Sequence, residues 1–322
     1  MSNTPVAVVL AAYHPPMDLL KKQVATILAQ EKVSVRLWIL ADGPMPQLPE
    51  LRNLAAGDDR IILVEQPNNL GSTETFLAGV ESLCTDEWFT KNQALLAFAD
   101  QDDEWDPDRI SATAENILSG MSDGVHADAR LINVDGQSIY PSLFVYGAKK
   151  RDPTIVELVF RNNATGMAMT LSHEAARELA ALRIVRPSDW IHDHLAAFVA
   201  ATGKGLTFVE RPLVSYRQHG ENQIGAGTYR EQAAPTFAFL GKHSKPAGTL
   251  RELRRFLVEF GNRDWASDSA REELCDVRRA ISPYGVAGFA RTVSFVGKVP
   301  MHRSMKARLL LEAGFPPSRT YR

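Results

Sequence analysis

Three carboxylates lie within four residues of one another, directly after an apolar segment. The run from Ala94 to Phe98 is typical of a buried strand, and Asp100, Asp102 and Asp103 follow it. Carboxylates this close are costly to ionise unless a cation or a hydrogen-bond donor compensates them. A hard divalent ion suits them, because it takes carboxylate and phosphate oxygens together. The segment therefore predicts a metal and diphosphate site at the carboxyl end of a sheet, where open α/β folds bind ligands.

Acidic clusters also occur in solvated loops and at helix N-termini, which is the plainer interpretation of this segment. Asp106 and Pro107 match a helix N-cap followed by proline at the first helical position. That interpretation explains Asp106, but it does not explain why three acids crowd the end of a buried strand. We therefore favour the metal and diphosphate site.

Two more polar segments fall where a strand ends or a helix begins. Asp42 and Gly43 follow the apolar run 35–40, where an acid can accept a hydrogen bond from a nucleotide base or ribose. Gly43 lets the backbone turn sharply, and a simple turn explains the pair equally well. Asn69 and Gly71 precede a helix that Ser72 can cap, and helix N-termini favour anions. This second segment predicts either a nearby nucleotide or only a cap.

Histidines mark two later segments of the chain. His192 and His194 flank Asp193, and this trio can bind a metal or hold a general base. Zinc is disfavoured because adjacent residues point to different sides of a helix, and a plain helix cap also explains Asp193. Further on, Arg217 can clamp phosphate and His219 can ligate a metal, in a glycine-containing loop that could close on a substrate. Any polar loop after a strand would look similar.

An alternation of strands and helices must position these side chains. Strands are predicted at 6–13, 35–40, 60–64 and 94–98, with helices beginning at Asp18 and Ser72 between them. This order predicts a parallel, doubly wound sheet. The middle of the chain adds helices at 172–182 and 191–201 and a strand at 206–209. After residue 227 the pattern is helical, with a capping box at Thr249 and Glu252 and a second helix at 269–281.

Composition places the chain among ordinary globular proteins. Of its 322 residues, 45% are hydrophobic and 23% are charged, and the length suits one large domain with an appendage or two domains. Cys84 and Cys275 fit neither a disulfide framework nor a zinc motif. No apolar run reaches the roughly 18 residues that span a bilayer. Because the N-terminus also lacks the features of a signal peptide, we expect a cytoplasmic protein.

Charge is distributed unevenly along the chain. Residues 228–322 carry 17 basic and 9 acidic side chains, a net charge of +8, whereas residues 1–227 carry a net charge of −10. The stretch 289–315 has a basic amphipathic character, which is typical of a membrane-surface segment. A helix packed on the domain, a solvated helical face or a contact with a second copy in a homodimer explains it as well. One expected location is therefore the inner face of the cytoplasmic membrane, with the protein bound peripherally.

The polar motifs together, in their order, resemble a known family. A strand-end Asp-Gly, then Asp-x-Asp-Asp-x-Trp, then His-Asp, then Tyr-Arg-Gln-His-Gly-x-Asn resembles the inverting family 2 glycosyltransferases of the GT-A fold. The last two motifs look most like bacterial rhamnosyltransferases, which use dTDP-L-rhamnose. The resemblance covers residues 6–226. It implies an α/β GT-A nucleotide-diphospho-sugar transferase fold, with a Rossmann-like, mostly parallel sheet, over residues 1–227. Residues 228–322 would be a helical C-terminal extension.

On the donor side, the resemblance implies a role for each motif residue. Asp42 would bind the base or ribose, and Asp100 would lie near the ribose and diphosphate. Asp102 would ligate the divalent ion. Asp103 would touch the sugar or hold Asp102 in place. His219 would complete the metal site, and Arg217 would neutralise diphosphate oxygens. Asn69 and Gly71 complete the residues expected around the donor.

On the acceptor side, the resemblance implies a general base. Asp193 would deprotonate the acceptor hydroxyl. The side chains and backbone expected to line the acceptor are those of Asn163, Thr165, Gly166, Trp190 and His192.

We therefore expect a metal-dependent inverting glycosyltransferase that uses Mg²⁺ or Mn²⁺. It would move L-rhamnose from dTDP-rhamnose to a hydroxyl of a cell-surface or lipid-linked glycan, with no nucleic-acid partner. The segment 41–44 lacks the family's second acid and serine, which leaves a UDP-sugar open as donor. A sugar nucleotidyltransferase is one alternative, but the segment 12–16 lacks its glycine-rich basic loop. A catalytically silent glycan-binding or scaffold protein is the other, and the intact acids disfavour it.

Overall fold

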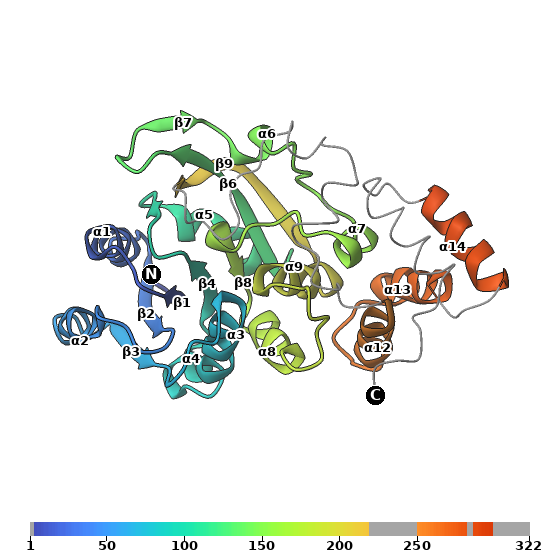
Figure 1. Cartoon of the computed structure of the whole chain (residues 1–322), viewed down its shortest axis with the longest axis horizontal. Helices are drawn as coiled ribbons and strands as arrows, with labels where there is room; N and C mark the ends of the chain where they lie inside the picture. Colours follow the sequence, from blue (N-terminus) through green and yellow to red (C-terminus); the bar gives the residue numbers. More distant parts are fainter. Residues whose placement is uncertain (1–2, 219–249, 282–285, 299–322) are drawn as a thin grey trace.

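The computed structural model describes residues 3–218, 250–281 and 286–298 (Figure 1). Its centre is a nine-stranded sheet with the order β3-β2-β1-β4-β8-β6-β9-β5, and β7 pairs with β6 beside this path. The strands are β1 (Thr4–Ala12), β2 (Val33–Ala41), β3 (Ile61–Glu65), β4 (Leu95–Ala99), β5 (Glu104–Trp105), β6 (Gly124–Ile132), β7 (Ser138–Tyr140), β8 (Met169–Leu171) and β9 (Leu206–Arg217).

The first four strands form the predicted parallel sheet. β1 pairs in parallel with β2 and β4, and β2 with β3, so Ala12 and Ala41 lie side by side at one edge. β8 then runs antiparallel to both β4 and β6, while β6 and β9 are parallel. The prediction of a mostly parallel α/β sheet of the Rossmann-like kind is confirmed.

Helices cover both faces of the sheet. The helices in the described residues are α1 (Met17–Leu28), α2 (Leu48–Ala56), α3 (Ser72–Leu83), α4 (Glu87–Asn92), α5 (Arg109–Leu118), α6 (Leu143–Tyr146), α7 (Ile155–Phe160), α8 (His173–Leu182), α9 (His192–Thr202), α12 (Leu250–Gly261), α13 (Asp268–Ala280) and α14 (Val286–Lys298), with a 3₁₀ turn, η1, at Gly166–Ala168. α1, α2 and α5 bury their apolar residues against one face, and α3, α8 and α9 bury theirs against the other.

Several predicted element ends are wrong. Pro16, not Asp18, is the N-cap of α1, and Gly71, not Ser72, is the N-cap of α3. α5 begins at Arg109 because Asp106 is committed elsewhere, in an ion pair of 2.6 Å with Arg130. The predicted strand 206–209 continues to residue 217, since it pairs along the length of β6. By contrast, the start near Ser172 is confirmed, because its hydroxyl accepts the N–H of Ala175.

The described residues after position 249 are helical, as predicted. Phe256 and Phe260 of α12 are fully buried and pack on Phe198 of α9, with ring centroids 5.5 and 4.9 Å away. Burying each phenyl ring contributes about 2 kcal/mol. α12 and α13 thus extend the core that α3, α8 and α9 begin. Three predicted features lie outside the described residues: the domain boundary at 227, Thr249 of the predicted capping box and residues 299–315 of the basic stretch. The other residue of the capping box, Glu252, accepts two hydrogen bonds from Ser188.

None of the helices in the described parts of the chain is long and apolar enough to cross a bilayer.

Candidate active site

Loops at the carboxyl ends of β1, β2 and β4 meet at one edge of the sheet. Because these strands are neighbours and parallel, the residues that follow them emerge together. Gln101, after β4, exchanges hydrogen bonds with the backbone of Tyr13, after β1, at 2.9 and 3.3 Å. The strand-end segments that the sequence singled out are therefore adjacent.

Asp42 joins two of the predicted segments. Its carboxylate is 2% exposed, and its two oxygens accept the backbone N–H groups of Leu70 and Gly71 at 2.6 and 3.0 Å. Gly43 is required here: its φ is +87°, and a Cβ would lie 2.7 Å from the backbone nitrogen of Asn69. Asn69 itself is exposed. This geometry fixes the 68–71 loop against the end of β2, where a nucleotide contact of Asp42 stays a prediction.

The acid cluster after β4 is partly withdrawn from solvent. Burial, and then the negative charges of Asp102 and Asp193, raise the pKa of Asp100 to about 7. Burial and the charges of Asp100 and Asp102 hold the pKa of Asp103 well above its usual range. Asp103 is fully buried, and its Oδ2 has no hydrogen-bond partner among the residues that the structure describes. The expected cost of ionising crowded carboxylates is thus present, and a cation at this place would lower it.

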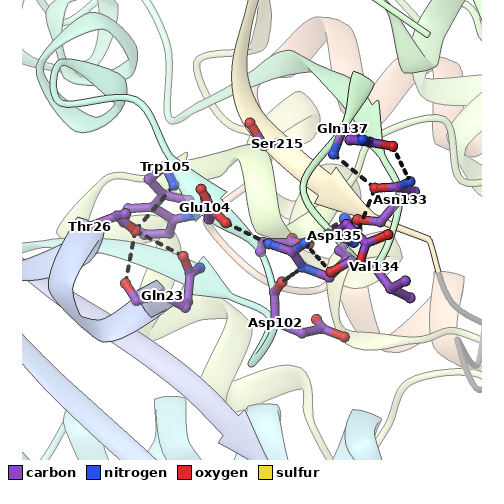
Figure 2. A network of polar contacts seen from close by, with 12 residues as sticks. Gln23, Thr26, Asp102, Glu104, Trp105, Asn133, Val134, Asp135, Gln137 and Ser215 are labelled. Carbon is purple, nitrogen blue, oxygen red and sulfur yellow. Dashed lines mark hydrogen bonds and ion pairs between the residues drawn. The ribbon is translucent and has the colours of Figure 1, made fainter. Parts of the chain in front are cut away.

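Arg217, at the end of β9, holds this cluster in place. Its backbone N–H donates to Asp103 Oδ1 at 3.0 Å, and its Nε donates to the carbonyl of Asp102 at 2.9 Å. The same guanidinium donates to the carbonyls of Asn133 and Val134 and to the carboxylate of Glu104. Figure 2 shows Asp102, Glu104, Asn133 and Val134 gathered around this point. With the side chain 1% exposed, this geometry favours a positioning role for Arg217 over the predicted neutralisation of diphosphate.

A second carboxylate, from α9, lies near the acid cluster. Asp193 lies in the first turn of that helix, near enough to Asp100 to raise its pKa. Asn162 donates through Nδ2 to Asp193 Oδ1 at 2.8 Å, and the N–H of Gly166 donates to Oδ2 at 3.2 Å. A carboxylate oriented in this way fits the chemistry of a general base. The sequence analysis missed Asn162, for which the chain offers no local signal.

The two histidines beside Asp193 point in different directions. His192 stacks on Phe76 at 4.0 Å, and His194 stacks on Trp190 at 4.2 Å. Burial lowers the pKa of both, to about 4 for His194, so both rings are neutral near pH 7. They pack α9 against α3 and against its own preceding loop rather than forming a pair of ligands.

The remaining predicted acceptor-side residues lie beside Asp193 or in the core around it. A Cβ on Gly166 would lie 2.9 Å from His192 Nε2 and 3.2 Å from the Asp193 Cβ. Asn163 and Thr165 are buried, and the Thr165 hydroxyl has no partner. Trp190 is 4% exposed, so its contact with an acceptor stays a prediction.

The oxygen ligands of the acid cluster suit a hard divalent ion, although the described residues do not form a complete metal centre. Asp100, Asp102 and Asp103 offer oxygen ligands of the kind that Mg²⁺ and Mn²⁺ take. Within residues 3–218, 250–281 and 286–298, no three His, Cys, Asp or Glu side chains converge closely enough to form such a site. His219 lies just outside these residues.

Comparisons with known proteins agree with this geometry. A family model described as "Glycosyl transferase family 2" matches residues 7–175. The structure resembles residues 1–349 of TarS from S. aureus in complex with UDP-GlcNAc, with a TM-score of 0.52 and 12% identity over 96% of this chain and 79% of that one. A complex of the same protein with UDP gives a TM-score of 0.50 and 12% identity over 92% and 76% of the two chains. At these identities the likeness shows the fold. No curated protein sequence matches the chain.

Proposed function

Since the chain belongs to glycosyl transferase family 2 and has its GT-A fold, we propose that it is a metal-dependent, inverting sugar transferase. The observation that carries this proposal is the position of Asp193. Its carboxylate is held by Asn162 and Gly166, and its charge acts on Asp100 of the acid cluster that follows β4. A base on one side and a diphosphate site on the other is the arrangement that in-line displacement at a sugar carbon needs.

The proposed reaction needs one proton transfer and one displacement. Asp193 takes the proton of the acceptor hydroxyl, and the oxygen forms a bond to the anomeric carbon from the face opposite the diphosphate. The bond from that carbon to the diphosphate oxygen breaks, and its electron pair leaves with the nucleoside diphosphate. A divalent ion held by Asp102, with Asp100 and His219 beside it, would neutralise charge on the leaving diphosphate. Base catalysis of this kind contributes about 10²–10⁴-fold to the rate.

For the donor, we propose dTDP-L-rhamnose first. The motifs around Asp193 and Arg217 support it by their resemblance to rhamnosyltransferases. A UDP-sugar such as UDP-GlcNAc is the second candidate, because the similar TarS fold has been seen with UDP-GlcNAc and with UDP. The acceptor in this proposal is a hydroxyl of a surface glycan or of a lipid-linked glycan.

The excess of basic residues after position 227 supports a peripheral position at the cytoplasmic membrane in this proposal. The same surface could instead join two copies of the chain. Sedimentation of the full chain with anionic vesicles, at low and high salt, separates these ideas. Vesicle binding that weakens at high salt supports the peripheral membrane position. A concentration-dependent dimer without vesicle binding supports the homodimer.

The function is tested by binding and slow hydrolysis of a donor panel: dTDP-rhamnose, UDP-glucose, UDP-galactose, UDP-GlcNAc and GDP-mannose. Each donor is measured with Mg²⁺, Mn²⁺ or EDTA. We expect metal-dependent binding of one donor, lost in Asp102→Ala and retained in Asp59→Asn, which changes an exposed acid away from the site. If no donor binds with either metal, the transferase proposal fails and the silent-scaffold alternative stands.

A further inference from the structure

Arg109, the first residue of α5, is a buried cation without an acidic partner among the described residues. Its side chain is fully buried, and burial lowers its pKa to about 9. Nη2 donates to the backbone carbonyls of Met167 and Met169 at 3.0 and 2.9 Å, and Nη1 donates to Thr170 Oγ1 at 3.1 Å. The guanidinium also lies 4.0 Å from the centre of the Trp105 ring.

A buried guanidinium is an expensive way to fill this space. Removing a charge from water without an opposite charge costs several kcal/mol, and an apolar side chain of similar volume would avoid that cost. Within the described parts of the chain, Nε of Arg109 also has no hydrogen-bond partner, which adds to this cost. What an apolar side chain cannot do is bind two carbonyls and a hydroxyl in fixed positions while stacking on an indole ring. The geometry therefore indicates a role in placing the segments that it contacts.

Those segments belong to the two halves of the candidate site. Trp105 ends the acid loop that begins at Asp100, on the donor side. Met167 directly follows Gly166, whose N–H binds the carboxylate of Asp193 on the acceptor side. Gly166 has no room to shift toward α9, because even a Cβ there would press on His192. A displacement of the 166–169 backbone would therefore be passed on to Asp193.

We propose that Arg109 is a positioning residue that sets the separation between the acid loop and the base Asp193. This inference rests on the proposed function. Transfer in line requires the base, the acceptor oxygen and the leaving diphosphate to be aligned, and a misplacement of about 1 Å can cost about 10²-fold in rate. In the proposed function the donor is bound by the acid loop and by the 68–71 loop at Asp42, and not by the 166–169 backbone, so Arg109 matters for transfer more than for donor affinity.

The test replaces Arg109 with Met, which is apolar and of similar length, and with Lys, which keeps the charge but has one nitrogen. We expect the donor Kd to stay within about threefold, while kcat for transfer falls about 10- to 100-fold in Arg109→Met. We also expect donor hydrolysis to rise as a share of turnover. Amide hydrogen exchange at 166–170 is the second readout, and it should become faster in both variants.

Arg263→Met is the control, because it removes a guanidinium that is only partly buried and binds Glu178 away from the site. It should lower stability without changing kcat or the exchange at 166–170. The inference is overturned if donor affinity and kcat fall together in Arg109→Met, or if exchange at 166–170 equals that of the wild type. Should the wild type bind no donor, the proposed function fails, whereas the exchange measurement still decides whether Arg109 holds this backbone.

Discussion

In both Asp42 and Asp193, each carboxylate oxygen accepts a hydrogen bond from the protein. The groups that donate these hydrogen bonds come from different kinds of structure. Asp42 binds two consecutive backbone N–H groups, of Leu70 and Gly71, in a loop that leads into a helix. Asp193 binds one side-chain amide and one N–H from an irregular segment between α7 and β8. The donor side is thus built from the regular strand–loop–helix pattern, whereas the acceptor side depends on contacts that the pattern does not supply.

Asp193→Asn tests the acceptor side and should have the largest effect. The amide keeps the shape of the carboxylate but cannot take a proton, so transfer should fall about 10²–10⁴-fold. Donor affinity, measured by calorimetry with the preferred metal, should change little because the acid loop is intact. A transfer rate within tenfold of the wild type would remove Asp193 as the base, and Asp59→Asn serves as the control.

Gly43→Ala tests the donor side. A left-handed φ costs an alanine about 1–2 kcal/mol, and the new Cβ would press on the backbone of Asn69 at 2.7 Å. We expect the free energy of unfolding to fall by about 3 kcal/mol, with donor affinity reduced at least about tenfold as Asp42 loses the 68–71 loop.

Gly120→Ala is the matched control for this change. Gly120 has a similar φ of +76°, but apart from its two chain neighbours no described residue has an atom within 4 Å of the added Cβ. It should lose only about 1 kcal/mol in denaturant unfolding and keep full donor affinity. Equal losses in the two variants would mean that the contact with Asn69 contributes nothing.

Asn162→Ala sharpens the comparison on the acceptor side. It removes the amide that orients Asp193 Oδ1, and a hydrogen bond to a charged group contributes about 1.5–3 kcal/mol. We expect kcat for transfer to fall about tenfold, with donor affinity unchanged and a shifted pH profile of kcat. Asn92→Ala, at an exposed helix end, is the control. An unchanged pH profile together with an unchanged kcat would show that Asn162 does not act through Asp193.

The last test concerns the stability of the protein at low pH, through two buried histidines. Burial lowers the pKa of His126 and of His194 to about 4, below the usual 6.5. The unfolded chain therefore binds more protons than the folded chain between these values. Stability is complete above about pH 6.5 and is lost as the pH falls toward 4, by about 1.4 kcal/mol per pH unit for each ring. His126→Phe should flatten this slope in urea unfolding, and an unaltered slope would contradict the assignment.

The same contrast explains what the sequence could predict. The parallel strands and the Asp100–Asp103 cluster follow from short apolar runs and the residues after them, so their shared edge was predictable. The N-caps predicted at Asp18, Ser72 and Asp106 were wrong: α1 and α3 begin at other caps, Pro16 and Gly71, and Asp106 is held in an ion pair with Arg130. Asn162 and Arg109 carry no local signal, since their partners lie 31 and about 60 residues away.

The binding of the acid loop by β9 also has a consequence for the order in which the protein matures on the ribosome. Arg217 lies 114 residues after Asp103, whose carboxylate accepts its N–H. At translation speeds of about 5–20 residues per second, the loop is made roughly 6 to 23 s before the strand that holds it. During that interval the nascent chain has its first parallel strands and its cluster of acids, but not the contacts of Arg217 with Asp102 and Asp103. The growing polypeptide therefore becomes competent for donor binding only late in synthesis, when β9 joins the sheet beside β6.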